Sequence, residues 1–176
     1  MGKIRWIPGR GCGQHHSGGE KGKSDMKVVI DTNVVISGTF FGGLPRKIIE
    51  AVSECHLNAY ATDSIIREYD QSVLKVIHKN LGDLQSDLLA SFVRNLIVIP
   101  AVSVVDICRD PDDNKFLSCA KDAKALYIIS GDKDLLTIGK FEGIEIVTVT
   151  EFCARYLDSN SVKSFPCLRT NKNDLQ

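Results

Sequence analysis

A short apolar run that stops at a carboxylate constrains this chain more than any other feature. Residues 28–30 read Val-Val-Ile, and Asp31, Thr32 and Asn33 follow them directly. An uninterrupted run of apolar, β-branched residues predicts a strand buried in a parallel sheet. Ligands of open α/β sheets bind at the carboxyl ends of the strands, so Asp31 is a candidate site residue, with Thr32 and Asn33 placed to orient it.

Similar runs alternate with segments of helical period between residues 26 and 157. Strands are predicted at 27–30, 57–61, 96–100, 125–129 and 144–147, helices at 45–55, 63–81, 83–95, 110–123, 133–137 and 148–156, and a glycine-containing loop at 37–44. Strands that alternate with helices indicate a largely parallel sheet covered on both faces. The predicted fold class is therefore α/β, a three-layer α/β/α domain with a mostly parallel central sheet.

The two ends of the chain lack this periodicity. Residues 1–25 are rich in glycine and polar side chains and are predicted to be a disordered N-terminal extension, and residues 158–176 a flexible C-terminal tail. Met26 directly precedes the first strand, so a native start at Met26 is one interpretation. Residues 26–157 are then a single domain, which the length of 176 residues easily accommodates.

Charge and composition limit the classes of partner. Residues 26–157 carry 14 Lys and Arg against 18 Asp and Glu, so a nucleic acid would need a local basic groove or bridging metal ions. No apolar run approaches the roughly 20 residues that span a bilayer, and no secretory signal is apparent. The six cysteines form no CxxC pair, and we expect free thiols in a cytoplasmic protein.

A second carboxylate is expected at the same edge of the sheet. The predicted strand at 125–129 runs into Ser130, Gly131 and Asp132, which repeats the arrangement at Asp31. Gly131 permits a tight turn or the close approach of a ligand. Asp134 follows two residues later and either caps the short helix or joins the site.

The predicted helix at 110–123 carries a third acidic group. Asp110 is the expected N-cap with proline in the first helical position, and Asp113 shares a helical face with apolar residues at 116, 117 and 120. Asp112 lies about 100° away from that face. A carboxylate on a core-facing stripe is costly unless it is paired or binds a metal, so Asp113 is the stronger candidate ligand.

Glu68, in the first turns of the helix that begins near residue 63, completes the set. Several carboxylates gathered in one small α/β domain repel one another, and a hard divalent cation relieves that repulsion. Oxygen ligands favour Mg²⁺ or Mn²⁺ over zinc. The chemistry that such a site supports is metal-assisted attack of water on a phosphate.

The motifs that carry these residues resemble the PIN-domain family. They are Val28-Val29-Ile30-Asp31-Thr32-Asn33, Glu68-Tyr69 with Val73-Leu74, Asp110-Pro111-Asp112-Asp113-Asn114-Lys115-Phe116-Leu117 with Ala120, and Ser130-Gly131-Asp132-Lys133-Asp134-Leu135-Leu136. The likeness covers roughly residues 26–155, with the motifs in the family's order. It is greatest to the prokaryotic, VapC-like branch of toxins from toxin–antitoxin pairs.

The resemblance implies a Mg²⁺- or Mn²⁺-dependent ribonuclease whose acidic ligands are Asp31, Glu68, Asp113 and Asp132. Asn33 and Ser130 match the family's supporting polar positions, and Asp134 is an extra carboxylate of this branch. The implied partners are an RNA substrate and a small antitoxin protein. The resemblance is also compatible with a homodimer, and it implies no association with a membrane.

Three other functions are consistent with parts of the pattern. A phosphatase of the haloacid-dehalogenase type also has an Asp after its first strand, but it needs a second Asp at position 33 and an acid at position 136, which are Asn and Leu here. A catalytically silent RNA-binding module would not need all four carboxylates. A PIN-type nuclease that acts on DNA or in RNA processing would have the same residues. It would differ from a toxin in that no small antitoxin gene is expected beside its own gene.

Overall fold

The computed structural model describes residues 26–79 and 84–157, and within them one mostly parallel sheet organises the chain. Its strands are β1 (Lys27–Ile30), β2 (Asn58–Ala61), β3 (Ile97–Val98), β4 (Tyr127–Ile129), β5 (Lys140–Phe141) and β6 (Ile144–Val147). They lie in the order β3-β2-β1-β4-β6-β5, and only β5 runs antiparallel to its neighbour. The chain leaves β1 toward β2 on one side and later returns to β4 on the other.

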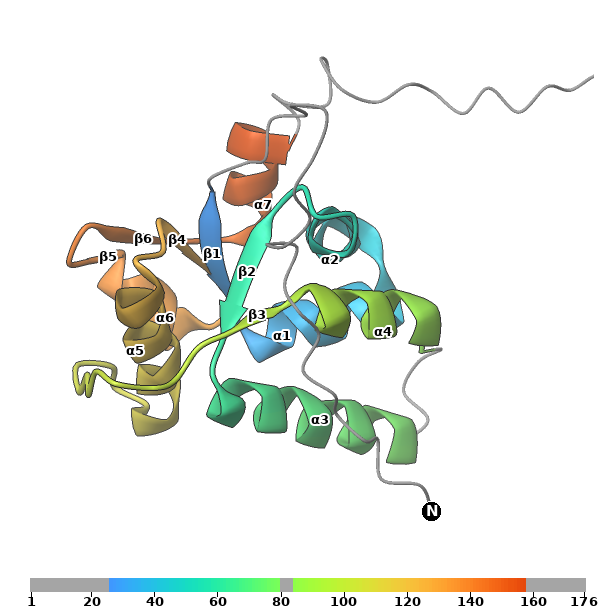
Figure 1. Cartoon of the computed structure of the whole chain (residues 1–176), viewed down its shortest axis with the longest axis horizontal. Helices are drawn as coiled ribbons and strands as arrows, with labels where there is room; N and C mark the ends of the chain where they lie inside the picture. Colours follow the sequence, from blue (N-terminus) through green and yellow to red (C-terminus); the bar gives the residue numbers. More distant parts are fainter. Residues whose placement is uncertain (1–25, 80–83, 158–176) are drawn as a thin grey trace, which may run out of the picture.

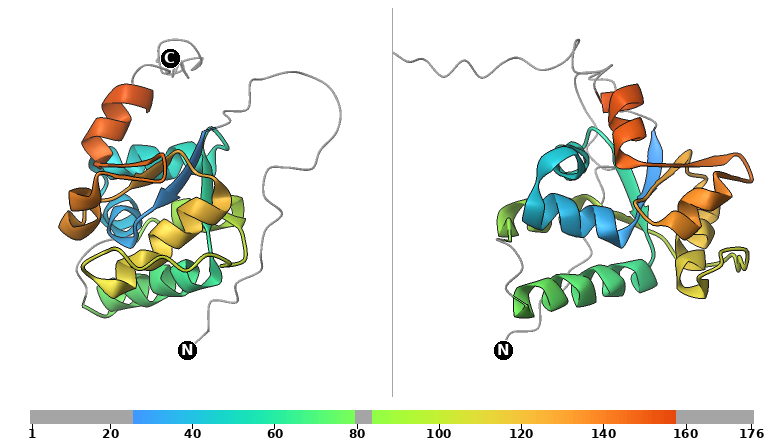
Figure 2. Two further views of the ribbon diagram at one scale, coloured as in Figure 1. Left: turned by 90° about the vertical axis from the view of Figure 1, so that its left-hand side faces the viewer. Right: turned by 180° about the vertical axis from the view of Figure 1, so that it is seen from behind.

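Helices cover both faces of this sheet. In chain order they are α1 (Thr32–Ile36), η1 (Ser37–Phe41), α2 (Gly43–Ser53), α3 (Asp63–His78), α4 (Ser86–Asn95), η2 (Pro111–Asp113), α5 (Asn114–Ala123), α6 (Lys133–Ile138), α7 (Val149–Phe152) and η3 (Cys153–Leu157). Figure 1 shows α1, α2 and α4 on one side of the sheet and α5 and α6 on the other, and Figure 2 gives the same layers from two further directions. The predicted three-layer α/β/α class is confirmed.

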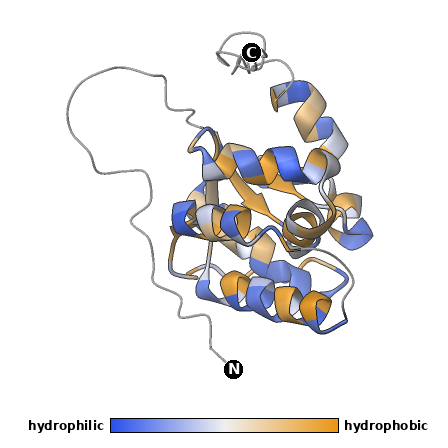
Figure 3. Ribbon diagram, turned by 90° about the vertical axis from the view of Figure 1, so that its right-hand side faces the viewer, coloured by the Kyte–Doolittle hydropathy of each residue, from blue (hydrophilic) through white to orange (hydrophobic). Residues whose placement is uncertain are grey.

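The hydrophobic core lies between these layers. The strands are mostly coloured as hydrophobic in Figure 3, whereas the helices carry both hydrophilic and hydrophobic residues. Phe92 of α4, Phe116 of α5 and Phe152 of α7 are among the largest fully buried side chains. Helix α5 packs against β1, β2 and β4 and therefore lies over the middle of the sheet.

The structure differs from the sequence predictions in several elements. The segment expected to be a loop forms η1, a π-helix, and α2 begins at Gly43 rather than at Pro45. The glycines that suggested a loop have other roles, because a Cβ on Gly38 would lie 2.7 Å from Ile49 Cγ1 in α2, and Gly42 has a φ of 82°. Strand β5 was missed, and the helix expected from Asp110 begins as the 3₁₀ turn η2.

Among the cysteines within residues 26–79 and 84–157, one differs from expectation. Cys108, Cys119 and Cys153 are free and buried, as predicted, but Cys55 is disulfide-bonded. The predictions for residues 1–25 and 158–176 fall outside the described residues. Within 26–79 and 84–157, no helix has both the length and the apolar character needed to cross a membrane.

Candidate active site

Asp31 and Ser130 emerge side by side at the carboxyl edge of the sheet. Strands β1 and β4 are parallel neighbours with Ile30 opposite Ile129, and the Asp31 amide donates to the Ile129 carbonyl over 2.9 Å. Ser130 Oγ then donates to Asp31 Oδ2 at 2.7 Å. This edge is the switch point of the topology, where crevices form in open α/β sheets.

The Asp31 carboxylate is held in an unfavourable electrostatic environment. Asp31 is only 3% exposed, and its carboxylate caps α1 by accepting a hydrogen bond from the Asn33 amide at 3.4 Å. Burial raises the pKa of Asp31, and the charges of Glu68 and Asp132 raise it further, against the lowering effect of the Ser130 and Asn33 hydrogen bonds. An additional positive charge at this point would therefore be stabilised.

Glu68 reaches the site from the second turn of α3. Thr32 Oγ1 donates to Glu68 Oε1 at 2.6 Å, while the other carboxylate oxygen forms an ion pair with the Lys115 ammonium. Thr32 was expected to orient Asp31, but its hydroxyl orients Glu68 instead. The Asn33 side chain is exposed, and only its backbone amide contacts Asp31.

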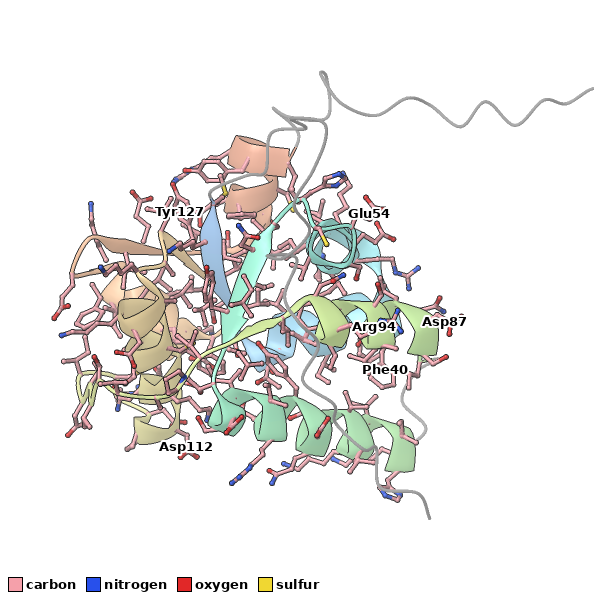
Figure 4. The ribbon with its side chains drawn as sticks, in the orientation of Figure 1. Phe40, Glu54, Asp87, Arg94, Asp112 and Tyr127 are labelled. Atoms are coloured by element: carbon pink, nitrogen blue, oxygen red, sulfur yellow. The ribbon has the colours of Figure 1, made fainter. Side chains whose placement is uncertain are left out.

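Asp113 and Asp112 have different surroundings, although they are adjacent. Asp112 is exposed, and Figure 4 shows it at the periphery of the molecule. Asp113 is half-buried at the end of η2, and its pKa is raised to about 6 by burial and by the charges of Asp132, Asp31 and Asp110. Asp110 is exposed and caps η2 by accepting from the Asp112 amide at 3.0 Å.

Asp132 and Asp134 follow β4. The Asp132 amide donates to Ser130 Oγ at 2.9 Å, and Asp132 Oδ1 caps α6 by accepting from the Asp134 amide at 2.7 Å. The Asp134 carboxylate pairs with Arg109 at 2.8 Å. Gly131, between the strand and the cap, does not adopt a positive φ, and a Cβ at this position would have no atom of a non-adjacent residue within 4 Å. Open space rather than a strained turn therefore adjoins Asp132.

Two residues of the site, Tyr69 and Lys115, were not predicted from the sequence to have a functional role. Tyr69 is buried on α3, and its hydroxyl donates to the Ile30 carbonyl, immediately before Asp31. Burial, together with the nearby Asp31 charge, raises the pKa of Tyr69 well above its ordinary value, so the hydroxyl keeps its proton. Lys115 is the other. Both lie within the motifs quoted above, but their contacts join different elements and no local pattern predicts them.

The structure thus gathers carboxylates from four elements. Asp31 follows β1, Glu68 comes from α3, Asp113 from η2 and Asp132 follows β4. The charges of Glu68 and Asp132 act on Asp31, and those of Asp132 and Asp31 act on Asp113. Among the described residues, no three His, Cys, Asp or Glu side chains form a ready-made metal-ligand group.

Comparison with known proteins gives a consistent result. A model of the PIN domain matches residues 27–134. The uncharacterized protein MJ1680 of Methanocaldococcus jannaschii is 38% identical over 120 residues, which are 66% of this chain and 77% of that protein.

Solved structures are similar to this chain at low sequence identity. PAE2754 from Pyrobaculum aerophilum has a TM-score of 0.50 and 14% identity, over 77% of this chain and 92% of its own. VapBC2 from Rickettsia felis, bound to a DNA fragment from their promoter, has a TM-score of 0.49 and 12% identity, over 70% of this chain and 98% of its own.

Proposed function

The chain belongs to the PIN-domain family, and from this premise we propose that it is a divalent-metal-dependent ribonuclease that hydrolyses phosphodiester bonds. Members of the family are generally nucleases. The observation that carries the proposal is the set of carboxylates at one sheet edge, where burial, and then the charges of Asp132 and Asp31, raise the pKa of Asp113 to about 6. Clustered carboxylates that resist ionisation together are typical of a site that functions with a cation bound.

The donor set fits Mg²⁺ or Mn²⁺. All four candidate ligands, Asp31, Glu68, Asp113 and Asp132, supply carboxylate oxygens, which hard divalent cations prefer. The described side chains do not converge as a ready-made ligand group. Ser130 fixes the orientation of Asp31, the most buried of the four candidate ligands.

Each residue has a distinct part in this proposal. A bound divalent ion would lower the pKa of a water molecule and stabilise negative charge on the phosphate. Ser130 holds Asp31 in place, Tyr69 fixes the end of the strand before it, and Thr32 holds one oxygen of Glu68. The described histidines, His56 and His78, lie outside this cluster, after α2 and at the end of α3, so the proposal assigns no role to a histidine base.

The RNA substrate and the partners rest on the sequence motifs. The resemblance to VapC-like toxins supports RNA as the substrate and a small antitoxin protein as the partner, with a homodimer compatible with both. The proposed antitoxin partner is tested by the reading frame next to this gene, because toxins of this kind are encoded beside the gene of their antitoxin.

The enzymatic proposal is tested with purified full-length protein on labelled single-stranded RNA and on DNA of the same sequence. We expect cleavage of RNA with Mn²⁺ or Mg²⁺ and none in EDTA. Full activity in EDTA would overturn the metal mechanism. Cleavage of DNA alone would instead support a DNA nuclease, and RNA binding without cleavage under all metal conditions would support a silent binding module.

A further inference from the structure

A lysine lies among the acidic residues of the site. Lys115 is the second residue of α5, and its ammonium forms an ion pair with Glu68, whose other oxygen is bound by Thr32. The same ammonium acts on Asp113, where it opposes the effects of burial and of the neighbouring carboxylates. Lys115 thus contacts one candidate ligand and electrostatically favours the ionised form of another.

The position of Lys115 is unusual for a lysine. Its side chain is only 23% exposed, and it lies in the first turn of a helix, where the macrodipole disfavours a positive charge. Lys121 on the same helix provides a contrast, because it lies in the last turn, pairs with Glu142 and is 41% exposed. The carboxylates around Lys115 therefore offset a helix position that is itself unfavourable for a cation.

The ion pair also accounts for the orientation of Glu68. The Glu68 carboxylate is held between Thr32 and Lys115, which contact one oxygen each. Among the described residues, Glu68 is not part of a ready-made metal-ligand group with Asp31, Asp113 or Asp132. A divalent ion that used Glu68 would compete with the ammonium, because both cations are attracted to the same carboxylate. Two cations that share one ligand oppose each other's binding.

We propose that Lys115 is a tethered counter-cation of the acidic site, which holds Glu68 until a divalent cation replaces its ammonium. This inference rests on the proposed metal site and adds a positioning residue to it. Lys115 lowers the repulsion within the metal-free cluster and, for the same reason, weakens the binding of the ion. The lysine therefore sets the concentration at which the divalent ion enters the site.

The test is calorimetric titration of the full-length protein with MnCl₂, without nucleic acid, at fixed pH and ionic strength. Lys115→Met keeps the length of the side chain and removes its charge. We expect it to bind Mn²⁺ about three- to tenfold more tightly than the wild type, as removal of one competing ion pair allows. Lys115→Arg keeps the charge and should restore an affinity close to that of the wild type.

Lys121→Met is the matched control. Lys121, like Lys115, is on α5, pairs with a glutamate and lies near a phenylalanine ring, but it is remote from the carboxylate cluster. Its Mn²⁺ affinity should equal that of the wild type. If the wild type binds Mn²⁺ and Lys115→Met binds it equally or more weakly, the counter-cation role is wrong while the metal site stands. If the wild type binds no Mn²⁺, both this inference and the proposed function fail.

Discussion

Ser130 Oγ donates a hydrogen bond to Asp31 Oδ2 over 2.7 Å and joins two residues that lie 99 positions apart in the chain. The same oxygen accepts from the Asp132 amide at 2.9 Å. One buried hydroxyl thus links the ends of β1 and β4 and sets the positions of two candidate ligands. The geometry of the acidic site therefore depends on the pairing of these strands.

Replacement of Ser130 by alanine removes both contacts. The Asp31 carboxylate is buried and would lose a hydrogen bond to a charged group, so Ser130→Ala should lower the free energy of unfolding by about 1–3 kcal/mol. Urea denaturation near neutral pH measures this loss. Ser53→Ala is a control, because the Ser53 hydroxyl donates only within its own helix, to the Ile49 carbonyl. A loss no larger than that of the control would contradict the role assigned to Ser130.

Asp113 makes the metal-free protein pH-sensitive. Its pKa is raised from 3.8 to about 6 in the folded protein, so between these values the folded state binds more protons than the unfolded state. Stability from this group therefore falls as the pH rises through that window. Asp113→Asn removes the effect and should become the more stable protein above pH 6, on the order of 1 kcal/mol after solvent screening of this half-buried group.

The measurement is urea denaturation of the wild type, Asp113→Asn and Asp112→Asn in EDTA from pH 4 to pH 7. The advantage of Asp113→Asn over the wild type should grow with pH, whereas exposed Asp112→Asn should show no such trend. An advantage that shrinks with rising pH would show that Asp113 is not destabilised by its neighbours.

Asp122 fixes the extended segment that precedes the site. Its carboxylate accepts from the amides of Val102 and Ser103 and from the Ser103 hydroxyl, and these bonds lower the pKa of Asp122. Asp122→Ala should accelerate hydrogen exchange at the Val102 and Ser103 amides. The Val105 amide, which donates to Ser118, is an internal control. Unchanged exchange at all three amides would contradict this anchoring.

The lowered pKa of Asp122 also has a pH consequence. A carboxyl whose pKa is lower in the folded state stabilises the fold above its unfolded value of 3.8, and this contribution is lost as the pH falls through the folded value. In wild-type protein, exchange at Val102 and Ser103, corrected for the intrinsic pH dependence, should therefore rise in acid. The exchange rate of the Val105 amide, measured at each pH, supplies this correction.

The sequence predicted the parts of the fold that follow from local pattern. β1 and β6 begin and end where the sequence predicts, because each is a short segment rich in β-branched residues. Asp31 and Asp132 follow strand ends in the structure for the same reason. The π-helix at Ser37–Phe41 was missed, because Gly38, which allows close packing against α2, has the same local pattern as a loop glycine.

The contacts within the site required the tertiary structure. Local spacing placed Glu68 on a helix and Asp113 on an inward face, but it could not show that Lys115 pairs with Glu68. That contact joins α3 and α5 and depends on how both pack at the edge of the sheet. The role expected for Thr32 was wrong for a similar reason, since its hydroxyl reaches across to α3 instead of back to Asp31.

Asp113 and Asp112 provide the most direct test of the central claim, that the inward carboxylates form a catalytic metal site. The two residues are adjacent and chemically identical, and they differ in burial and in electrostatic contact with Asp31 and Asp132. The measurement is the rate of RNA cleavage with Mn²⁺ for Asp113→Asn and Asp112→Asn, each compared with the wild type. We expect Asp113→Asn to lose about tenfold to a hundredfold or more and Asp112→Asn to retain nearly full activity. Loss of activity in Asp112→Asn alone, or in neither variant, would contradict the proposed site.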